Sequence, residues 1–348
     1  MELPGIELPA ALVRNASRLP GGRAWLSRWQ DLVHSALAEW ELTLDLPGGR
    51  RPWFGSAAVV LPVHRADGSR AVLKVTVPHD DALPEPDALR LWAGCGAVKL
   101  LEASREDYVL LLERLDGDQS LAGVPLAETA GIWGGLVKDL ALAPGSGELW
   151  QDIPSVAAQA EMWTDTLPAD WDRLGRPFER WLLECALEVC QVRGAVGRRS
   201  ERDVLLHSDL HYLNIRTRPS PAGAIVPVGV VGPADAPAPA PSYVAIDPKP
   251  VVGDAEFAVA PMLWNRIGDL FPGDPAGHLR ERCSDLAFAA DLDPLLARDW
   301  SVVREVQNAL SAVESGNRDD AQRSLWVAST LLRRTLPELP SPADLVSP

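Results

Sequence analysis

Apolar residues recur at helical spacing near the start of the chain. Trp25, Trp29, Val33 and Leu37 follow one another four residues apart, with polar positions between them. Side chains at this spacing lie on one face of an α-helix. We therefore expect the first forty or so residues to be helical, with a tryptophan-rich face that packs into a core.

A β-rich stretch follows. Residues 57–63 and 70–77 are rich in Val, Ala and Leu and are joined by an Asp-Gly turn, a pattern typical of a hairpin. Alternation along the second strand places Val72 and Lys74 on the same face. The pattern next predicts a helix over 85–92, strands over 97–101 and 108–112, and a linker over 113–117.

From about residue 125 onward the pattern is mostly helical. Helix-like periodicity runs through 133–142, 156–167, 178–192, 259–270, 279–290, 300–313 and 320–336. The exception is the region between 192 and 259, where short strands flank a loop. Within it, residues 218–242 are dense in Pro and Ala, which predicts an extended, flexible insertion.

Composition and charge narrow the class of protein. The chain has 348 residues, 47% of them hydrophobic, which is ordinary for a globular protein with a large core. A formal net charge of −15 argues against a nucleic-acid partner and would suit a cationic small molecule, although solubility is the simpler explanation. No apolar run is long enough to cross a membrane, and the first residues do not resemble a signal peptide. We expect a cytoplasmic protein with no membrane partner.

The four cysteines are scattered and none has C-x-x-C spacing. This distribution predicts buried, reduced thiols and argues against a metal site built from cysteine.

The strongest chemical signal is an H-x-D-x-x-x-x-N string that begins at His207. A carboxylate in such a loop, here Asp209, can accept a hydrogen bond from a hydroxyl group and orient it for in-line attack. Asn214, and Asp247 after a later apolar run, offer the hard oxygen donors that Mg²⁺ prefers, with nucleotide phosphates completing its shell. His207 and His211 are supporting residues. The alternative is that Asp209 and His211 only cap a turn.

A nucleotide site is indicated upstream. Lys74 matches the V-A-I-K pattern, so its ammonium could contact the α- and β-phosphates, and Val72 would face the adenine. Glu85 on the following helix is the better ion-pair partner for Lys74, and Asp87 is the competitor.

The segment before the hairpin, where a glycine-rich loop is expected, contains a single glycine. Gly55 and Ser56 offer one hydroxyl and free backbone N–H groups to a phosphate. Taken alone, this segment is more typical of a hairpin turn than of a phosphate cradle.

The order of elements, a small antiparallel sheet, a linker and a helical region with embedded strands, is typical of a bilobal protein-kinase-like α+β fold. We expect an N-terminal lobe over residues 1–115 and a C-terminal lobe over residues 116–348.

Three segments carry a resemblance to a known family. They are residues 206–214, the Asp-Pro-Lys string within 246–254, and residues 262–266. Together they resemble the aminoglycoside/hydroxyurea antibiotic resistance kinases, a group that includes the streptomycin 6-phosphotransferases. Residues 88–101 and 111–115 are also similar, and the likeness runs from about Trp25 to the C-terminal helices, which is most of the chain. The Asp-Pro-Lys string is fairly specific to this branch, whereas the H-x-D-x-x-x-x-N core is shared more widely.

The resemblance implies Mg-ATP as cofactor, transfer to a hydroxyl group, Asp209 as base, and Mg²⁺ held by Asn214 and Asp247. It also implies adenine bound through backbone groups of the linker from Glu113 to Leu115.

The resemblance further suggests that Asp254 or Glu256 meets a cationic or polyhydroxylated substrate. A solvated loop is the equally plain alternative for these two acidic residues.

Two departures from the family pattern bear on activity. Where the family carries a carboxylate that braces the catalytic loop, this chain has Ala258, so the loop could be looser and turnover lower. The Pro/Ala insertion lengthens the connection between Asn214 and Asp247, which a metal site can tolerate because long loops cost little free energy.

These observations favour an ATP-dependent O-phosphotransferase acting on an aminoglycoside or hydroxyurea-type antibiotic, as a monomer or homodimer. Two alternatives stay open: a metabolic sugar or amino-alcohol kinase on the same fold, and a nucleotide-binding pseudokinase. The absence of an A-P-E segment argues against a protein substrate.

Overall fold

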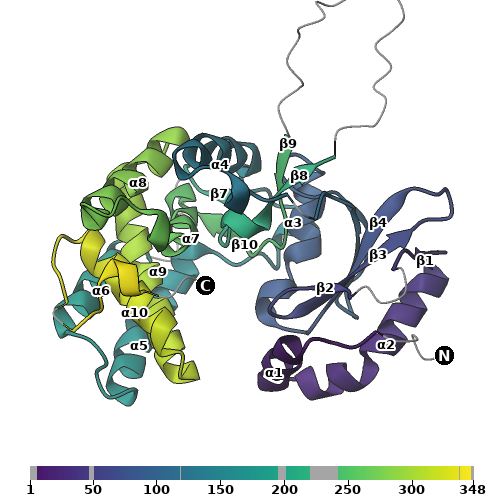
Figure 1. Ribbon diagram of the computed structural model, residues 1–348, viewed down its shortest axis with the longest axis horizontal. Helices are drawn as coiled ribbons and strands as arrows, with labels where there is room; N and C mark the ends of the chain where they lie inside the picture. Colours follow the sequence, from purple (N-terminus) through teal and green to yellow (C-terminus); the bar gives the residue numbers. More distant parts are fainter. Residues whose placement is uncertain are drawn as a thin grey trace, which may run out of the picture. The chain divides into compact units, whose positions relative to one another are not determined.

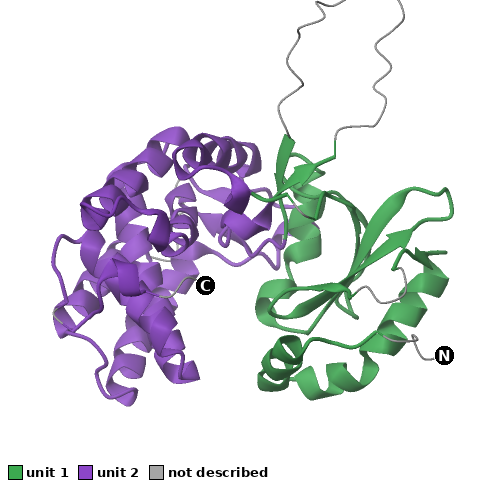
Figure 2. Ribbon diagram, in the orientation of Figure 1, with its two compact units in different colours: residues 1–120, 216–246 green, residues 121–215, 247–348 purple. Residues whose placement is uncertain are grey.

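The computed structural model describes residues 6–46, 51–117, 119–194, 201–219, 242–336 and 338–345. The chain divides into two compact units, coloured separately in Figure 2: unit 1 comprises residues 1–120 and 216–246, and unit 2 comprises residues 121–215 and 247–348. The segment 216–246, placed with the second lobe on sequence grounds, is grouped with unit 1. The reason is visible in its backbone bonds, because Val98 N donates to Ala245 O and Asp116 N donates to Thr217 O.

Unit 1 is an antiparallel sheet with flanking helices (Figure 1). The strands pair in the order β1-β3-β4-β6-β5, with β2 on β3, and β8 and β9 form a separate pair. The helices are α1 (Ala10–Arg18), α2 (Gly22–Glu39) and α3 (Glu85–Trp92). The strands are β1 (Thr43–Leu44), β2 (Trp53–Phe54), β3 (Ala58–His64), β4 (Arg70–Thr76), β5 (Leu100–Ser104), β6 (Val109–Glu113), β8 (Ile215–Arg218) and β9 (Ser242–Ala245).

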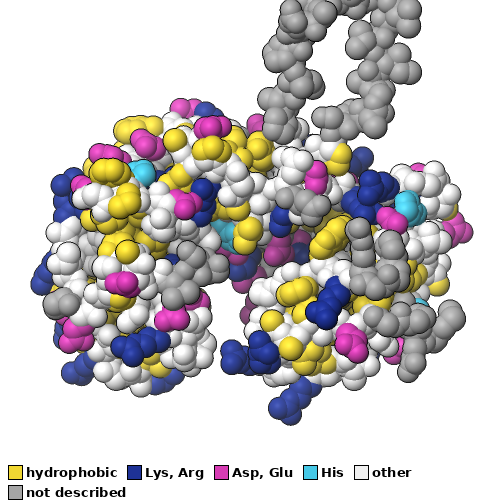
Figure 3. All heavy atoms as spheres, viewed as in Figure 1, with side chains coloured by type: hydrophobic (Ala, Val, Ile, Leu, Met, Phe, Trp, Pro, Cys, Tyr) yellow, Lys and Arg dark blue, Asp and Glu magenta, His cyan; other side chains and the backbone are white. Residues whose placement is uncertain are grey.

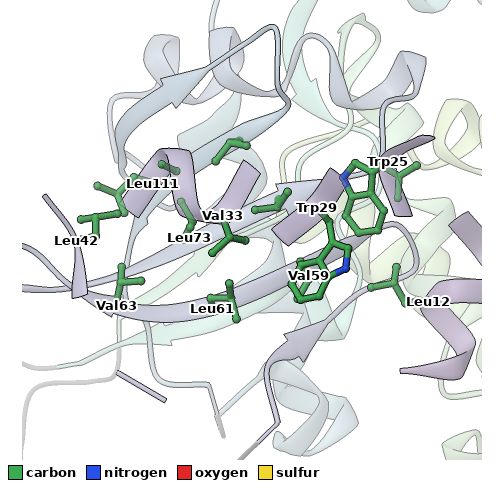
Figure 4. Packing of buried hydrophobic residues seen from close by; sticks show 14 of the residues in the cluster. Leu12, Trp25, Trp29, Val33, Leu42, Val59, Leu61, Val63, Leu73 and Leu111 are labelled. Atoms are coloured by element: carbon green, nitrogen blue, oxygen red, sulfur yellow. The ribbon is translucent and has the colours of Figure 1, made fainter. Parts of the chain in front are cut away.

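The core of unit 1 forms where α2 packs on the sheet. Trp25, Trp29 and Val33 of α2 are buried in one cluster with Leu61 of β3 and Leu73 of β4 (Figure 4). The four-residue spacing of the helix side chains and the two-residue spacing of the strand side chains both direct apolar groups to this layer. The predicted core-packing role of the tryptophan-rich face is confirmed.

The β3–β4 hairpin closes with the turn that the Asp-Gly pair predicts. Gly68 has a φ of +79°, a conformation that glycine adopts without steric cost. The Asp67 carboxylate accepts a 2.8 Å hydrogen bond from Ser69 N, which fixes the turn from the inside.

Unit 2 is mainly helical. Its helices are α4 (Leu126–Leu140), α5 (Val156–Arg173), α6 (Arg180–Arg193), α7 (Ala260–Trp264), α8 (Pro275–Ala289), α9 (Pro294–Ser315) and α10 (Arg318–Leu331). Its strands are β7 (Val204–His207) and β10 (Pro250–Gly253), which pair antiparallel. Each of the seven predicted helical segments contains a helix. The segment 259–270 is broken after Trp264 because Asn265 is extended and Arg266 has a φ of +60°.

Acidic and basic side chains are interspersed over the face shown in Figure 3. None of the described helices is long and apolar enough to cross a membrane.

The cysteine prediction was partly wrong: Cys190 and Cys283 are buried and Cys185 is half-buried, but Cys95 is exposed. Cys95 lies in a tight turn between Gly94 and Gly96, both of which have a positive φ.

Most of the predicted flexible insertion lies outside the described residues. Its two described ends are Arg218, the last residue of β8, and Ser242, the first residue of β9.

Candidate active site

The loop that follows β7 carries the H-x-D-x-x-x-x-N string. Asp209 N donates to His207 Nδ1 at 3.1 Å, and Leu213 N donates to His211 Nδ1 at 3.2 Å. Both histidines therefore shape the loop, in keeping with their predicted supporting role.

Asp209 is held within hydrogen-bonding distance of a cation. Lys249 Nζ lies 2.9 Å from Asp209 Oδ2, and the Asp209 side chain is 25% exposed. Burial opposes ionisation of Asp209, but Lys249, His211 and Arg304 outweigh it and lower the pKa of the carboxyl below its ordinary value of 3.8. Asp209 is therefore a carboxylate at neutral pH and can accept a hydrogen bond from a hydroxyl group.

Asn214 and Asp247 fit the chemistry of a magnesium site. Asn214 is buried and its Nδ2 donates to Asp209 O at 3.0 Å, so its amide oxygen is the atom left for a cation. Asp247 is exposed between β9 and β10 with a φ of +54°. Within the described ranges no cluster of three or more His, Cys, Asp or Glu side chains could hold a metal unaided. An amide oxygen and one carboxylate suit an ion whose shell is completed by phosphates and water.

Three side chains that the sequence analysis did not identify donate hydrogen bonds to this loop, each from a helix far away in the sequence. Trp133 Nε1 of α4 donates to Leu210 O at 3.1 Å. Arg304 of α9 donates to Ser208 O and, at 3.1 Å, to Phe257 O. Arg282 of α8 donates to the Tyr212 hydroxyl. No spacing rule marks such residues, because each lies in an ordinary amphipathic helix.

The two acidic residues proposed for substrate differ in their surroundings. Glu256 is 2% exposed, and its Oε1 accepts from Arg202 Nη2 at 2.9 Å and from Asp293 N at 3.1 Å. These bonds argue against the predicted substrate role of Glu256, because binding a substrate there would break contacts that hold the start of α9. Asp254 is half-buried and accepts from Trp300 Nε1 at 3.0 Å, so a substrate role for Asp254 stays a prediction.

In unit 1, Lys74 forms the ion pair that the sequence predicts. Its Nζ lies 2.7 Å from Glu85 Oε1 and 2.8 Å from Oε2, and both residues are buried. The competitor Asp87 binds Arg90 and Arg105 instead. Alternation along β4 places half-buried Val72 on the same strand face as Lys74.

Gly55 and Ser56 form the turn between β2 and β3. Gly55 N donates to Ala58 O at 2.9 Å, and a Cβ atom built on Gly55 would meet no other atom within 4 Å. The turn is therefore open on this side, as a phosphate-binding turn must be, although a simple hairpin turn would look the same.

The linker residues differ in how much of their backbone is used. Glu113 N donates to Lys99 O at 3.0 Å, and the Glu113 carboxylate accepts from Arg218 Nη2 at 2.6 Å. Leu115 makes no backbone hydrogen bond with any other described residue. Of the predicted adenine contacts, Leu115 is thus the residue whose backbone can still pair with a base.

Solved structures share this fold. Aminoglycoside phosphotransferase APH(4)-Ia, as a thermostable mutant with AMP-PNP and hygromycin B, matches with a TM-score of 0.54 at 14% identity, over 81% of this chain and 92% of that chain. Amicoumacin kinase with AMP-PNP and Ca²⁺ matches with a TM-score of 0.55 at 14% identity, over 91% of this chain and 98% of that chain. The class is therefore defined: the chain has the protein-kinase-like fold of these small-molecule kinases, as its sequence predicts.

Sequence comparisons identify the family. A model of the aminoglycoside/hydroxyurea antibiotic resistance kinases matches residues 49–145. Streptomycin 6-kinase of Streptomyces griseus is 33% identical over 335 residues, covering 94% of this chain and 98% of the relative. Hydroxyurea phosphotransferase of Kitasatospora aureofaciens is 34% identical over 335 residues, covering 94% and 87%. The chain belongs to the aminoglycoside/hydroxyurea antibiotic resistance kinase family, which confirms the resemblance.

Proposed function

We propose that the protein transfers the γ-phosphoryl group of ATP to a hydroxyl group of a small antibiotic, either a streptomycin-like aminoglycoside or hydroxyurea. The observation that carries this proposal is the Asp209 loop, in which the Asp209 carboxylate is paired with Lys249 and the Asp209 carbonyl accepts from the Asn214 amide. The names of the relatives support the acceptor class, since they include a streptomycin 6-kinase and a hydroxyurea phosphotransferase.

Each unit supplies part of the chemistry. In unit 1, Lys74, fixed by Glu85, is the candidate contact for the nucleotide phosphates, and the Leu115 backbone is the candidate contact for adenine. In unit 2, Asn214 and Asp247 would hold Mg²⁺, which when bound neutralises charge on the phosphates.

Asp209 performs the acceptor step. Its carboxylate accepts a hydrogen bond from the substrate hydroxyl and orients that oxygen toward the γ-phosphorus. As the oxygen–phosphorus bond forms and the bond to the ADP oxygen breaks, the hydroxyl proton passes to Asp209. Phosphoryl transfer of this kind depends mainly on positioning, which is the reason for so many contacts around the loop.

An acceptor panel tests the proposal. ADP release with Mg-ATP is measured with streptomycin, hydroxyurea, choline and a simple sugar, and phosphorylated product is identified by mass spectrometry. We expect product with streptomycin or hydroxyurea from the wild type and none from Asp209→Asn. Product from choline or the sugar alone would favour a metabolic kinase. ATP binding with no transfer to any acceptor would favour a pseudokinase, and either result would overturn the proposal.

A further inference from the structure

Lys249 is attached to the catalytic loop at two points. Its carbonyl oxygen accepts from both Ser208 N and Ser208 Oγ, each at 2.9 Å. Its ammonium lies 2.9 Å from Asp209 Oδ2. Backbone and side chain of one residue thus hold two consecutive residues of the loop, and all of these groups belong to unit 2.

The backbone around Lys249 is constrained on both sides. It is preceded by Asp247 with a φ of +54° and by buried Pro248, whose ring fixes its own φ. It is followed by Pro250, which is the register partner of His207 in the β10–β7 ladder. These constraints fix the backbone position from which the Lys249 side chain extends toward Asp209.

Lysine is rare among the basic residues of this protein, so its presence at position 249 stands out. Only four of the 33 Lys and Arg residues are lysines: Lys74, Lys99, Lys138 and Lys249. Elsewhere the chain pairs its carboxylates mostly with arginine. The two ion pairs in the candidate catalytic motifs, Lys74–Glu85 and Lys249–Asp209, both use lysine. An arginine fork tends to take both oxygens of a carboxylate, whereas the Lys249 ammonium is a point charge that lies against Asp209 Oδ2.

We propose that Lys249 is a positioning residue for phosphoryl transfer, which holds Asp209 by one carboxylate oxygen so that the carboxylate meets the acceptor hydroxyl in a fixed orientation. This inference rests on the proposed function. Lys249 forms no bond to the reacting atoms in this role. The hydroxyl proton still passes to Asp209, and the phosphoryl group still moves from ADP oxygen to acceptor oxygen.

Kinetics of three variants test the role in catalysis. Lys249→Met keeps the length of the side chain but removes its charge, and we expect kcat to fall by about 100-fold, as misplacement of a catalytic group can cause. The KM for ATP should change by less than about twofold, because an effect on orientation alone leaves nucleotide binding intact. Lys249→Arg should give an intermediate kcat, because it restores the charge but can occupy both oxygens. Lys138→Met, which removes a lysine paired with exposed Asp291, is the matched control and should keep wild-type kcat.

Lysine labelling tests the ion pair without relying on activity. With four lysines in the chain, acylation by an amine-reactive ester can be followed at each lysine by mass spectrometry. Lys249 is 45% exposed on its side chain, so its reactivity should be limited by the pairing of its ammonium rather than by access. Asp209→Asn should raise the acylation rate of Lys249 several-fold and leave those of Lys99 and Lys138 unchanged.

The outcomes separate this inference from the proposed function. Equal labelling of Lys249 in the wild type and Asp209→Asn would show that the ion pair does not form in solution and would overturn the inference. Wild-type kcat in a folded Lys249→Met variant would also overturn it, with the phosphotransferase function intact. If Lys249→Met does not fold, Lys249→Arg is the variant that tests the role. Full wild-type kcat in Lys249→Arg, together with equal labelling of Lys249 in the wild type and Asp209→Asn, would then count against the inference. Absence of transfer by the wild type would remove the proposed function and this role with it, while a changed labelling rate would still establish the ion pair.

Discussion

Glu305, in the middle of α9, is fully buried, and neither of its carboxylate oxygens has a hydrogen-bond partner of ordinary geometry among the described residues. Burial raises the pKa of Glu305 from 4.5 to about 7, although Ser324, Arg304 and Asn308 lie close enough to oppose the shift. The unfolded chain therefore loses this proton well before the folded chain does. We predict that replacing Glu305 by Gln removes a cost that the folded protein carries above neutral pH.

The magnitude follows from the shift. Well below pH 4.5 Glu305 is protonated in both states and adds no pH-dependent cost. As the pH rises from 4.5 to about 7, the folded state is increasingly penalised for keeping a proton that the unfolded state has released. At about 1.4 kcal/mol for each pKa unit, the full penalty is roughly 3.5 kcal/mol and stays constant at higher pH. The free energy of unfolding therefore falls as the pH rises from 4.5, the pKa of Glu305 in the unfolded chain, to about 7, its pKa in the folded chain.

Urea unfolding measured across this pH range checks the prediction. The Glu305→Gln variant and the wild type should have similar free energies of unfolding near pH 5, and the variant should be more stable by about 3.5 kcal/mol near pH 8. Glu161→Gln, which changes an exposed residue of α5, is the control and should show no such trend. A difference between Glu305→Gln and the wild type that does not vary with pH would refute the reasoning.

Three further predictions concern the site and the packing of α4. Asp209→Ala should lower kcat by at least about a thousand-fold while ATP still binds, as measured by turnover and calorimetry, and residual turnover near the wild-type value would contradict its role. Lys74→Met should raise the KM for ATP, because it removes the candidate phosphate contact. It should also destabilise unit 1 by about 3 kcal/mol, because it leaves the buried Glu85 carboxylate unpaired, and thermal unfolding measures this second effect separately. Gly134→Ala should destabilise the protein by about 1–3 kcal/mol, because the new Cβ would lie 2.4 Å from backbone atoms of Ala289. The neighbouring Gly135→Ala has no atom within 4 Å and should stabilise α4 by about 0.5–1 kcal/mol, and equal effects of the two changes in denaturant unfolding would sink the packing argument.

Local patterns predicted the elements of this fold better than their ends. The period of the Trp25 face and the Asp-Gly turn are set by neighbouring residues, and both were found as expected. The strand expected over 97–101 instead runs from Leu100 to Ser104. Ala97 and Val98 are bonded to Ala245, a residue far along the chain, and no local pattern reveals such a partner.

Partners far apart in sequence also escaped prediction in the candidate site. The H-x-D-x-x-x-x-N string marked Asp209 and Asn214 because the roles proposed for them require fixed residue types at fixed spacing. Lys249 lies within the Asp-Pro-Lys string, but its bond to Asp209 depends on the pairing of β7 with β10. For Glu256 the sequence pattern does not show burial, because its partners Arg202 and Asp293 lie far away along the chain.

Ala258 shows how a missing group can be misleading when it is considered alone. Its lost carboxylate would have accepted hydrogen bonds from the catalytic loop, and its absence raised the expectation of a loose loop. In the structure the loop N–H groups of Asp209 and Leu213 find acceptors in the rings of His207 and His211. The loop carbonyls, in turn, accept from helix side chains, among them Arg304, which also binds the carbonyl of the residue before Ala258. The loop is thus held by ring nitrogens and helix side chains, so the alanine at position 258 does not by itself favour a pseudokinase over an active enzyme.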